Sequence, residues 1–222
     1  MGEKITLTAS DGFELDAWLA KPEGEPKGGV LVIQEIFGVN NHIREVTDGF
    51  AADGYAALAP AIFDRAGKGI ELGYEGDDIT RGATIARGQL DMTKTMADLQ
   101  AGIDYLGQYG KVGVVGYCFG GLLTWLCACN ATGVACASGY YGGGIAGMVD
   151  LKPKVPTILH FGEKDAHIPM TDVNKIKDAH PEVTVYVYEA DHGFNCDHRA
   201  SYDEAASKLA RSRTLAFFAE HL

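Results

Sequence analysis

A cysteine set between glycines is the first feature of this chain that could do chemistry. Residues 112–121 read Val-Gly-Val-Val-Gly-Tyr-Cys-Phe-Gly-Gly, so an apolar run leads directly into Cys118. This is the nucleophile-elbow pattern of strand, turn and helix, with Cys in the place that Ser usually holds. A sulfur at a helix N-terminus meets unpaired N–H groups and the positive end of the helix dipole, which favours the thiolate. The alternatives are a buried cysteine in a glycine-rich turn or a phosphate-binding loop, but the Walker and dinucleotide spacings are absent.

Two further side chains complete a predicted triad. An elbow nucleophile needs an orienting carboxylate and a base, and these follow it in the chain order acid, then His. Asp165 comes shortly after the apolar run 157–161, and His192 shortly after the run 184–188. Glu163 and Asp172 are alternative acids, but the position of Asp165 in its turn favours it. A lone Asp is usually a turn residue or a helix cap, and a lone loop His is usually solvated. The remaining histidines have no comparable setting and receive no role: His42, His160, His167, His180, His198 and His221.

The predicted oxyanion hole uses two backbone N–H groups. One belongs to Phe119, the residue after the nucleophile, and the other comes from the loop after an earlier buried strand, where Ile36 is the best candidate. Glu35 lies beside it, and a carboxylate at the end of a buried strand is costly unless it is paired. Glu35 is either a surface residue that caps the helix near His42, or a side chain that contacts Cys118 and shapes its protonation.

The elements that position these residues follow from the spacing of apolar side chains. Strands are expected at 4–9, 13–20, 29–33, 55–59, 112–116, 134–138, 157–161 and 184–188. Helices are expected at about 42–53, 80–106, 119–130, 172–179 and 201–221. Residues 61–80 lack periodicity and are expected to form a lid or binding rim. Strands alternating with helices after a hairpin predict an α/β class, a doubly wound, mostly parallel sheet with antiparallel N-terminal edge strands.

Composition narrows the class of protein. The 222 residues suit one domain over 1–222, and the net charge of −11 argues against a nucleic acid partner. No apolar run approaches the roughly 20 residues that cross a bilayer, and the N-terminus lacks a signal-peptide core. We therefore expect a cytoplasmic protein without a membrane partner, and a monomer by default. The cysteine count of five is odd, which favours free thiols over a disulfide framework.

Together these motifs resemble the dienelactone hydrolase family, the carboxymethylenebutenolidases and their relatives, within the α/β-hydrolase superfamily. The resemblance extends over essentially the whole chain. It rests on Gln-Glu-Ile-Phe-Gly-Val-Asn at 34–40, Gly-Tyr-Cys-Phe-Gly-Gly at 116–121, Tyr-Tyr-Gly at 140–142, and Asp165 with His-Gly-Phe at 192–194. It implies an α/β-hydrolase fold and a triad of Cys118, His192 and Asp165 that acts on an enol-lactone. It also implies that Tyr140 and Tyr141 lie at the substrate.

The resemblance bears on substrate charge as well. Well-known members hold a substrate carboxylate with two arginines. One lies in the loop before the long helix, where Arg81 or Arg87 is the nearest candidate. The other lies four residues after the catalytic His, and that position is Cys196 in this chain. Arg199 is near in sequence but would have to reach in from a different turn. Gly193 stands where those members carry a small hydroxyl residue. These departures put the substrate in question, not the reaction type.

One hypothesis and two rivals follow. The hypothesis is a hydrolase in which Cys118 attacks an ester or lactone carbonyl and His192 moves the proton, without a metal or organic cofactor. The resemblance implies that Glu35 holds or deprotonates Cys118, so that the thiolate forms mainly when substrate arrives. One rival is a non-catalytic binding protein on the same fold. The other is a redox-active thiol protein with Cys196 as resolving partner. The expected partner is a small-molecule ester or lactone.

Overall fold

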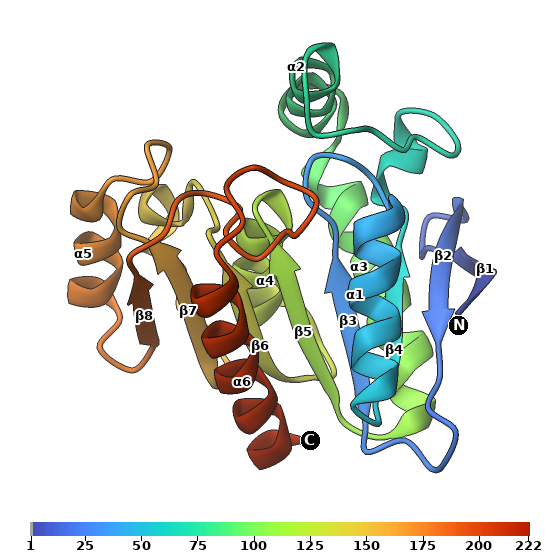
Figure 1. Ribbon diagram of the computed structural model, residues 1–222. Coiled ribbons are helices and arrows are strands. Elements are labelled where there is room, and N and C mark those ends of the chain that lie inside the picture. Colours follow the sequence, from blue (N-terminus) through green and yellow to red (C-terminus); the bar gives the residue numbers. More distant parts are fainter. Residues whose placement is uncertain (1) are drawn as a thin grey trace.

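Eight strands form one sheet in the computed structural model, which describes residues 2–222 (Figure 1). The strands are β1 (Glu3–Thr8), β2 (Glu14–Ala20), β3 (Gly29–Ile33), β4 (Ala56–Pro60), β5 (Val112–Tyr117), β6 (Val134–Tyr140), β7 (Thr157–Gly162) and β8 (Thr184–Tyr188). The α-helices are α1 (Asn41–Ala52), α2 (Asp77–Thr84), α3 (Met92–Leu106), α4 (Phe119–Asn130), α5 (Met170–Ala179) and α6 (Glu204–His221). Short 3-10 helices lie at Ile62–Arg65, Gly107–Tyr109 and Ile145–Met148.

The order of the strands confirms the predicted topology. They lie side by side as β1-β2-β4-β3-β5-β6-β7-β8. The pairs β1–β2 and β2–β4 are antiparallel, and all later pairs are parallel. The sheet is therefore doubly wound and mostly parallel, with antiparallel N-terminal edge strands. The carboxyl ends of the parallel strands meet at one edge, which is where such sheets place their ligands.

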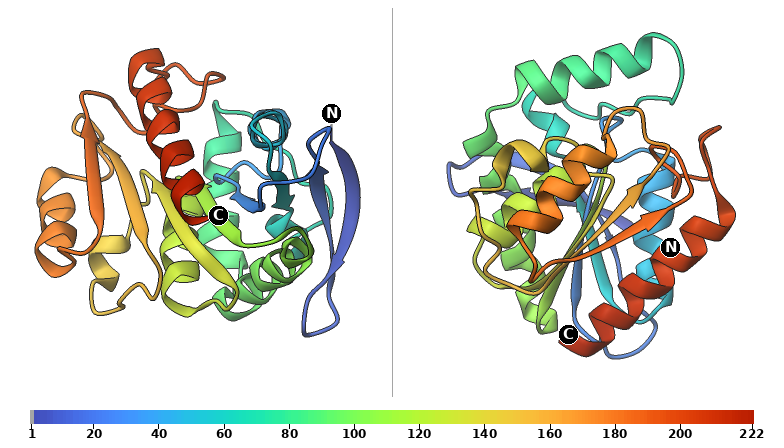
Figure 2. Two further views of the ribbon diagram at one scale, coloured as in Figure 1. Left: turned by 90° about the horizontal axis from the view of Figure 1, so that it is seen from below. Right: turned by 90° about the vertical axis from the view of Figure 1, so that its left-hand side faces the viewer.

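Helices cover both faces of the sheet, which explains the continuous apolar strands. The helices α1 and α6 lie on one face, and α3 and α4 on the other (Figure 2). Every residue of β3 and of β5 is buried as a result. A strand covered on both sides reads as an unbroken apolar run. The sequence around the elbow thus has the pattern of a central strand.

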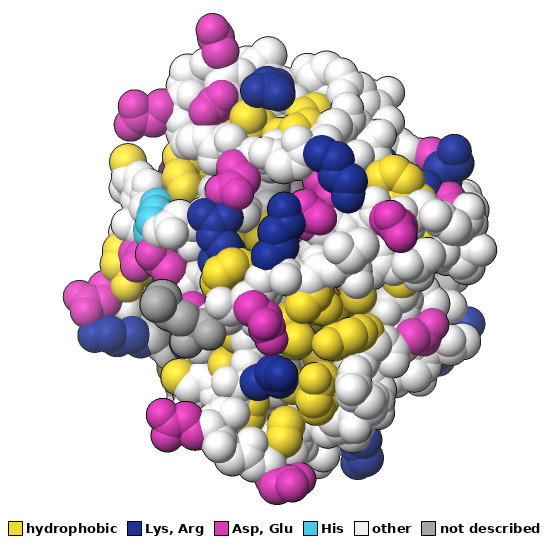
Figure 3. Space-filling view, turned by 90° about the vertical axis from the view of Figure 1, so that its right-hand side faces the viewer, with side chains coloured by type: hydrophobic (Ala, Val, Ile, Leu, Met, Phe, Trp, Pro, Cys, Tyr) yellow, Lys and Arg dark blue, Asp and Glu magenta, His cyan; other side chains and the backbone are white. Residues whose placement is uncertain are grey.

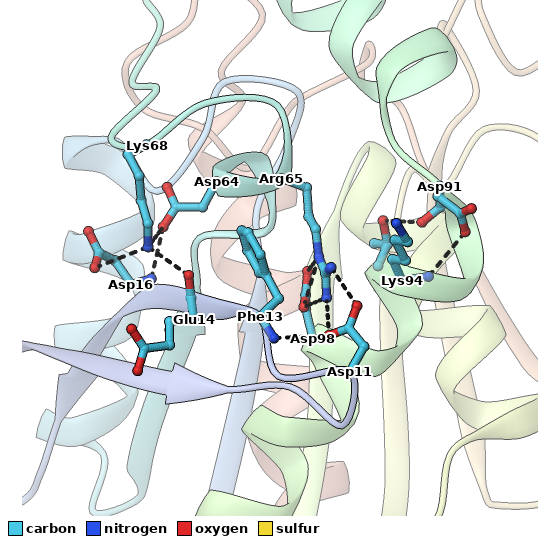
Figure 4. Close-up of polar contacts among 11 residues, drawn as sticks. Asp11, Phe13, Glu14, Asp16, Asp64, Arg65, Lys68, Asp91, Lys94 and Asp98 are labelled. Carbon is cyan, nitrogen blue, oxygen red and sulfur yellow. Dashed lines mark hydrogen bonds and ion pairs between the residues drawn. The ribbon is translucent and has the colours of Figure 1, made fainter.

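The N-terminal hairpin is tied to the helical layer by one arginine. The Arg65 guanidinium donates to both carboxylate oxygens of Asp98 in α3, at 2.6 to 3.2 Å, and to Asp11 in the hairpin turn at 2.7 and 3.0 Å (Figure 4). The Arg65 side chain also lies over the Phe13 ring, 4.0 Å from its centroid. Arg65 therefore connects the hairpin and α3 through one fully used side chain.

The prediction of one helix over residues 80–106 is wrong, because the structure has two helices there, with a break between them. The helix α2 ends at Thr84 and continues as one π-helical turn, Ile85–Gln89. Leu90 then adopts an extended conformation, and the Asp91 side chain caps α3 by accepting the N–H of Lys94 at 3.2 Å. The apolar spacing runs through the break, but Asp91 is a strong N-cap and starts a new helix.

The segment expected to be a loop at 61–80 is partly helical. It holds the 3-10 helix at Ile62–Arg65 and the start of α2. The helix α2 lies above the end of the sheet where the parallel strands terminate (Figure 1). The segment therefore reaches the predicted site edge, as a rim would.

The sheet edge formed by β1 and β2 carries interspersed basic, acidic and apolar side chains (Figure 3). A hollow of about 260 Å³ lies next to β2, and its lining includes Lys4, Asp16, Arg44 and Glu71. These charges pair with one another, Lys4 with Asp16 and Arg44 with Glu71. No predicted catalytic residue lines this hollow. Within residues 2–222, no helix is long and apolar enough to cross a bilayer.

Candidate active site

Cys118 sits at a strained turn between β5 and α4. Its backbone has φ 55° and ψ −114°, a region that side-chain-bearing residues rarely occupy. The turn is tight because the chain packs closely on its neighbours. A Cβ at Gly116 would lie 2.1 Å from the carbonyl oxygen of Gly120, and one at Gly120 would lie 2.3 Å from that of Ile33. The glycines around Cys118 are thus required by contact, and a strained residue in a turn from strand to helix is typical of a nucleophile elbow.

The three predicted triad side chains form a continuous chain of contacts. The Nε2 atom of His192 lies 3.2 Å from the Cys118 sulfur, and its Nδ1 atom lies 2.7 Å from Oδ2 of Asp165. The other oxygen of Asp165 accepts the backbone N–H groups of His167 and Ile168 at 2.8 and 3.2 Å. Asp165 is thereby locked in place and fully paired. The structure brings Cys118, His192 and Asp165 together, while the alternative acids of the sequence have no contact with His192.

The protonation of His192 is set by its two partners. Burial by itself lowers the pKa of the imidazole, but the hydrogen bonds with Asp165 and then with Cys118 outweigh burial and raise the pKa to about 10. The side chain is 11% exposed, so these contacts are only weakly screened by water. At neutral pH the ring therefore carries a proton between a carboxylate and a sulfur. A group with that proton can hand it to a leaving oxygen.

Glu35 is a buried side chain with a single partner. It is 0% exposed, and its Oε1 accepts from Nη1 of Arg199 at 3.1 Å. Its Oε2 is buried without a hydrogen-bond partner. The idea that Glu35 is a surface cap is wrong, because Asn40 caps α1 by accepting the N–H of Ile43 at 3.2 Å. Glu35 instead pairs with Arg199, a partner that the sequence did not predict, and its contact with Cys118 stays a prediction.

The predicted oxyanion donors stand at the ends of β5 and β3. Phe119 is the first residue of α4, where the N–H has no acceptor within the helix. Ile36 lies in the loop after β3, and Gly82 of α2 packs against its carbonyl, so closely that a Cβ there would lie 2.0 Å from the oxygen. The helix α2 is therefore in contact with the site loop. The roles of Phe119 and Ile36 remain predictions.

The predicted substrate-binding residues are placed unequally. Tyr140 is 1% exposed and its hydroxyl is 2.7 Å from Oγ1 of Thr214, which makes it part of the core rather than of the site. Tyr141 has a φ of 36° and its ring lies 5.1 Å from that of His192, with a hydroxyl that has no partner among the described residues. Arg81 is exposed on α2 and forms no ion pair within residues 2–222.

Arg199 received no role from the sequence, because it would have to reach in from a different turn. It does reach in from its own turn, and its guanidinium occupies the space beside Gly193. Gly193 has a φ of 77°, and a Cβ there would lie 2.4 Å from Nη1 of Arg199. The resemblance placed an arginine at position 196 and a small hydroxyl residue at position 193. Because Gly193 has no side chain, Arg199 can bring its guanidinium in from a different position than Cys196. The absent side chain at Gly193 was the available signal.

Two groups of side chains have donor atoms close enough to hold a metal ion. The first is Glu35, His42 and Cys196, all buried, and the second is His42, Glu45, Asp197 and His198, mostly exposed. All five cysteines are free thiols. Cys196 is 0% exposed, so it lacks the accessibility of a resolving thiol.

Comparison with known proteins gives a consistent result over the chain. The model of the dienelactone hydrolase family matches residues 15–222. A carboxymethylenebutenolidase of Pseudomonas putida is 34% identical over 227 residues, covering 98% of this chain and 96% of that protein. A Synechocystis protein provisionally given the same name is 38% identical over 242 residues, covering 99% and 98%. A Klebsiella pneumoniae crystal structure, described provisionally as a dienelactone hydrolase, has a TM-score of 0.85 and 30% identity, with 100% of both chains covered.

Proposed function

This chain belongs to the dienelactone hydrolase family, a group of ester and lactone hydrolases on the α/β-hydrolase fold, and we propose that it acts through a covalent acyl-cysteine on Cys118. The observation that carries the proposal is the chain of contacts from the Cys118 sulfur to His192 and on to Asp165, at 3.2 and 2.7 Å. It starts from a strained elbow at a helix N-terminus. That arrangement supplies a nucleophile, a proton carrier and an orienting carboxylate in one place.

The first half of the reaction forms the acyl-enzyme. The Cys118 sulfur attacks the substrate carbonyl carbon as a thiolate, because its proton is already held on Nε2 of His192. The carbonyl oxygen becomes an oxyanion, which accepts hydrogen bonds from the N–H groups of Phe119 and Ile36. When the carbon–oxygen bond breaks, His192 returns the proton to the leaving oxygen. The leaving group of a lactone stays attached to the acyl chain.

The second half restores the enzyme. Water gives a proton to His192 and attacks the thioester carbonyl, the same two N–H groups hold the oxyanion, and the carbon–sulfur bond breaks. The sulfur leaves as a thiolate beside the protonated His192, and a carboxylic acid is released. Asp165 accepts three hydrogen bonds and thereby holds the imidazole in one orientation throughout.

The substrate proposed for this site is an enol-lactone that carries a carboxylate, with neutral esters as poorer substrates. Arg199 places a guanidinium between Glu35 and Gly193, within the site rather than at its rim. A guanidinium is the side chain best suited to bind a carboxylate. Arg81 on α2 is the second candidate for anion binding, from the exposed side of the site.

The test is hydrolysis of a carboxylate-bearing dienelactone and of p-nitrophenyl acetate by purified variants. Cys118→Ala, His192→Ala and Asp165→Asn should each lower kcat by about a thousandfold or more, with losses that do not add because the three side chains act as a unit. Cys129→Ala is the matched control, because it removes a thiol that lies outside the site and should keep full activity. Near wild-type turnover by a correctly folded Cys118→Ala protein would show that the nucleophile lies elsewhere.

A further inference from the structure

Three buried side chains from separate parts of the chain converge into one group. Glu35 follows β3, His42 is in α1 and Cys196 is in the loop after His192. They are 0%, 3% and 0% exposed. A carboxylate oxygen, an imidazole nitrogen and the sulfur of this group all lie within 4.8 Å of one another. Cys196 is far in sequence from Glu35 and His42, so the fold itself assembles the group.

Two polar atoms of this group have nothing to bind. Oε2 of Glu35 and Nε2 of His42 are both inaccessible to solvent and have no hydrogen-bond partner within residues 2–222. Buried polar atoms are nearly always paired, and leaving one unpaired costs about 1–3 kcal/mol. Two such atoms in one small group therefore point to something that binds both. A carboxylate oxygen and an unprotonated imidazole nitrogen are both electron-pair donors, which suits a cation.

The partners of these side chains leave the free atoms available as ligands. Nδ1 of His42 lies 3.1 Å from Oδ1 of Asp197, so its hydrogen points to that carboxylate and Nε2 keeps its lone pair. Oε1 of Glu35 is held by Arg199 at 3.1 Å, which leaves Oε2 free. An imidazole backed by a carboxylate and a ligating carboxylate held by its other oxygen are typical supports of a metal site.

We propose that Glu35, His42 and Cys196 form a binding site for a thiophilic divalent cation, with Zn²⁺ as the best match. One oxygen, one nitrogen and one sulfur ligand are the donor set that Zn²⁺ prefers, and three protein ligands leave a fourth position open. Metal–ligand bonds of about 2.0–2.3 Å require ligand atoms about 3.3–3.8 Å apart in a tetrahedron. The present separations, at most 4.8 Å, need to shorten by up to about 1.5 Å. The Cys196 thiol releases its proton to solvent as the metal–sulfur bond forms.

The charges around the group allow such an ion. Glu35 and the Cys196 thiolate each bring one negative charge, and Asp197 lies behind His42. Arg199 is the positive charge that opposes the ion, and it stays on the far oxygen of Glu35. The exposed group of His42, Glu45, Asp197 and His198 competes for the same histidine but offers no sulfur.

The experiment measures metal binding in the absence of substrate, so its result does not depend on the proposed hydrolysis. The full chain with Cys118→Ser is titrated with Zn²⁺ by calorimetry and with Co²⁺ by absorption spectroscopy. We expect one equivalent of Zn²⁺ to bind, and Co²⁺ to give the charge-transfer band of a sulfur–cobalt bond. Adding Cys196→Ser should abolish that band, and adding His42→Gln should weaken Zn²⁺ binding by at least about tenfold.

Matched variants separate this site from other thiols and from the exposed group. Cys129→Ser changes a buried cysteine outside the group and should leave both signals intact. Glu45→Gln and His198→Gln test the exposed ligands and should also leave them intact. Circular dichroism of each variant checks the fold, and His42→Gln keeps the test decisive if Cys196→Ser does not fold. Absence of one-to-one binding, a cobalt–sulfur band that survives Cys196→Ser, or binding lost in Glu45→Gln would each overturn the proposal.

Discussion

Two fully buried carboxylates, each bound by one arginine, are built differently in two regions of the molecule. Asp98, beneath the N-terminal hairpin, accepts from Arg65 with both oxygens, and Arg65 spends its remaining donors on Asp11 (Figure 4). Glu35, at the site, accepts from Arg199 with one oxygen and leaves the other unpaired. A carboxylate with both oxygens bound holds the elements on either side together. A carboxylate with one free oxygen can still accept a hydrogen bond or bind a cation. The first pair is therefore structural, and the second belongs to the site.

The largest expected effect is on stability at the hairpin. Arg65→Ala leaves the Asp98 carboxylate buried without its counter-charge. Breaking such a pair costs about 3–5 kcal/mol, at least about a hundredfold in the ratio of folded to unfolded protein. Urea denaturation measures the free energy of unfolding, while the hydrolysis rate per folded molecule should stay unchanged. Lys208→Ala breaks an exposed pair with Glu204 and is the control. If Arg65→Ala and Lys208→Ala lowered the free energy of unfolding by the same small amount, the Arg65–Asp98 pair would not stabilise the hairpin against α3.

The next effect concerns substrate charge at the site. Arg199→Ala removes a charge-assisted hydrogen bond to a substrate carboxylate, worth about 1.5–3 kcal/mol, or about 10- to 150-fold in rate. The measurement is the ratio of kcat/KM for a carboxylate-bearing lactone to that for its methyl ester. Arg81→Ala should lower this ratio less, because Arg81 is exposed on α2. A larger fall for Arg81→Ala would move the anion-binding role to the rim.

Substituting one glycine in each region compares the free-energy cost of an added side chain in the hairpin and at the site. Gly12 in the hairpin turn and Gly193 at the site have similar φ values, 81° and 77°. A Cβ at Gly12 meets nothing within 4 Å, whereas one at Gly193 meets Arg199 at 2.4 Å. Gly12→Ala should cost only the backbone strain, about 1–2 kcal/mol in the free energy of unfolding. Gly193→Ala should cost more and also lower the carboxylate preference of hydrolysis.

The glycine comparison has an internal check. If the contact with Arg199 causes the extra cost, Gly193→Ala should destabilise the protein less in an Arg199→Ala background than in the wild type. Equal costs at both glycines, with additive effects of Gly193→Ala and Arg199→Ala, would mean that Arg199 does not need the space beside Gly193.

The smallest expected effect is on the reactivity of the free thiol. Glu35→Gln removes a negative charge from the site, so that Arg199 faces Cys118 without a counter-charge. An opposing carboxylate disfavours a thiolate, so the rate of Cys118 alkylation by iodoacetamide near neutral pH should rise severalfold. Glu163→Gln changes an exposed carboxylate in the turn after β7 and should leave the rate unchanged. An unchanged or lower alkylation rate in Glu35→Gln would show that Glu35 does not restrain the reactivity of the Cys118 thiol.

The parts of the fold that local patterns determine were predictable from the sequence. The helix after the elbow was expected over 119–130 and is α4 over Phe119–Asn130, because its start is fixed by the glycine-rich turn. The same rule of strand, turn and helix placed His192 and Asp165 at the ends of neighbouring strands, where they meet. The break at Asp91 was missed because apolar spacing alone does not register a capping residue in mid-pattern.

The electrostatics of the site were less predictable, because they depend on how far loop side chains reach. Sequence spacing ranked Arg199 behind Arg81, although Arg199 is the one that pairs with Glu35. The choice between Tyr140 and Tyr141 likewise depends on which ring faces the core, and the strand pattern of two adjacent tyrosines does not contain that information. Tyr140 bonds to Thr214 on α6, while Tyr141 lies beside His192.

The central claim is that Cys118 carries the acyl group during hydrolysis. The direct measurement is mass spectrometry of protein mixed with p-nitrophenyl acetate and quenched in acid within the first turnover, followed by peptide mapping. The account predicts a mass increase of one acetyl group per chain, located on Cys118 and absent from the Cys118→Ala protein. An acetyl group located on another residue, or full hydrolysis with no acylated protein at any quench time and intact activity of Cys118→Ala, would contradict it.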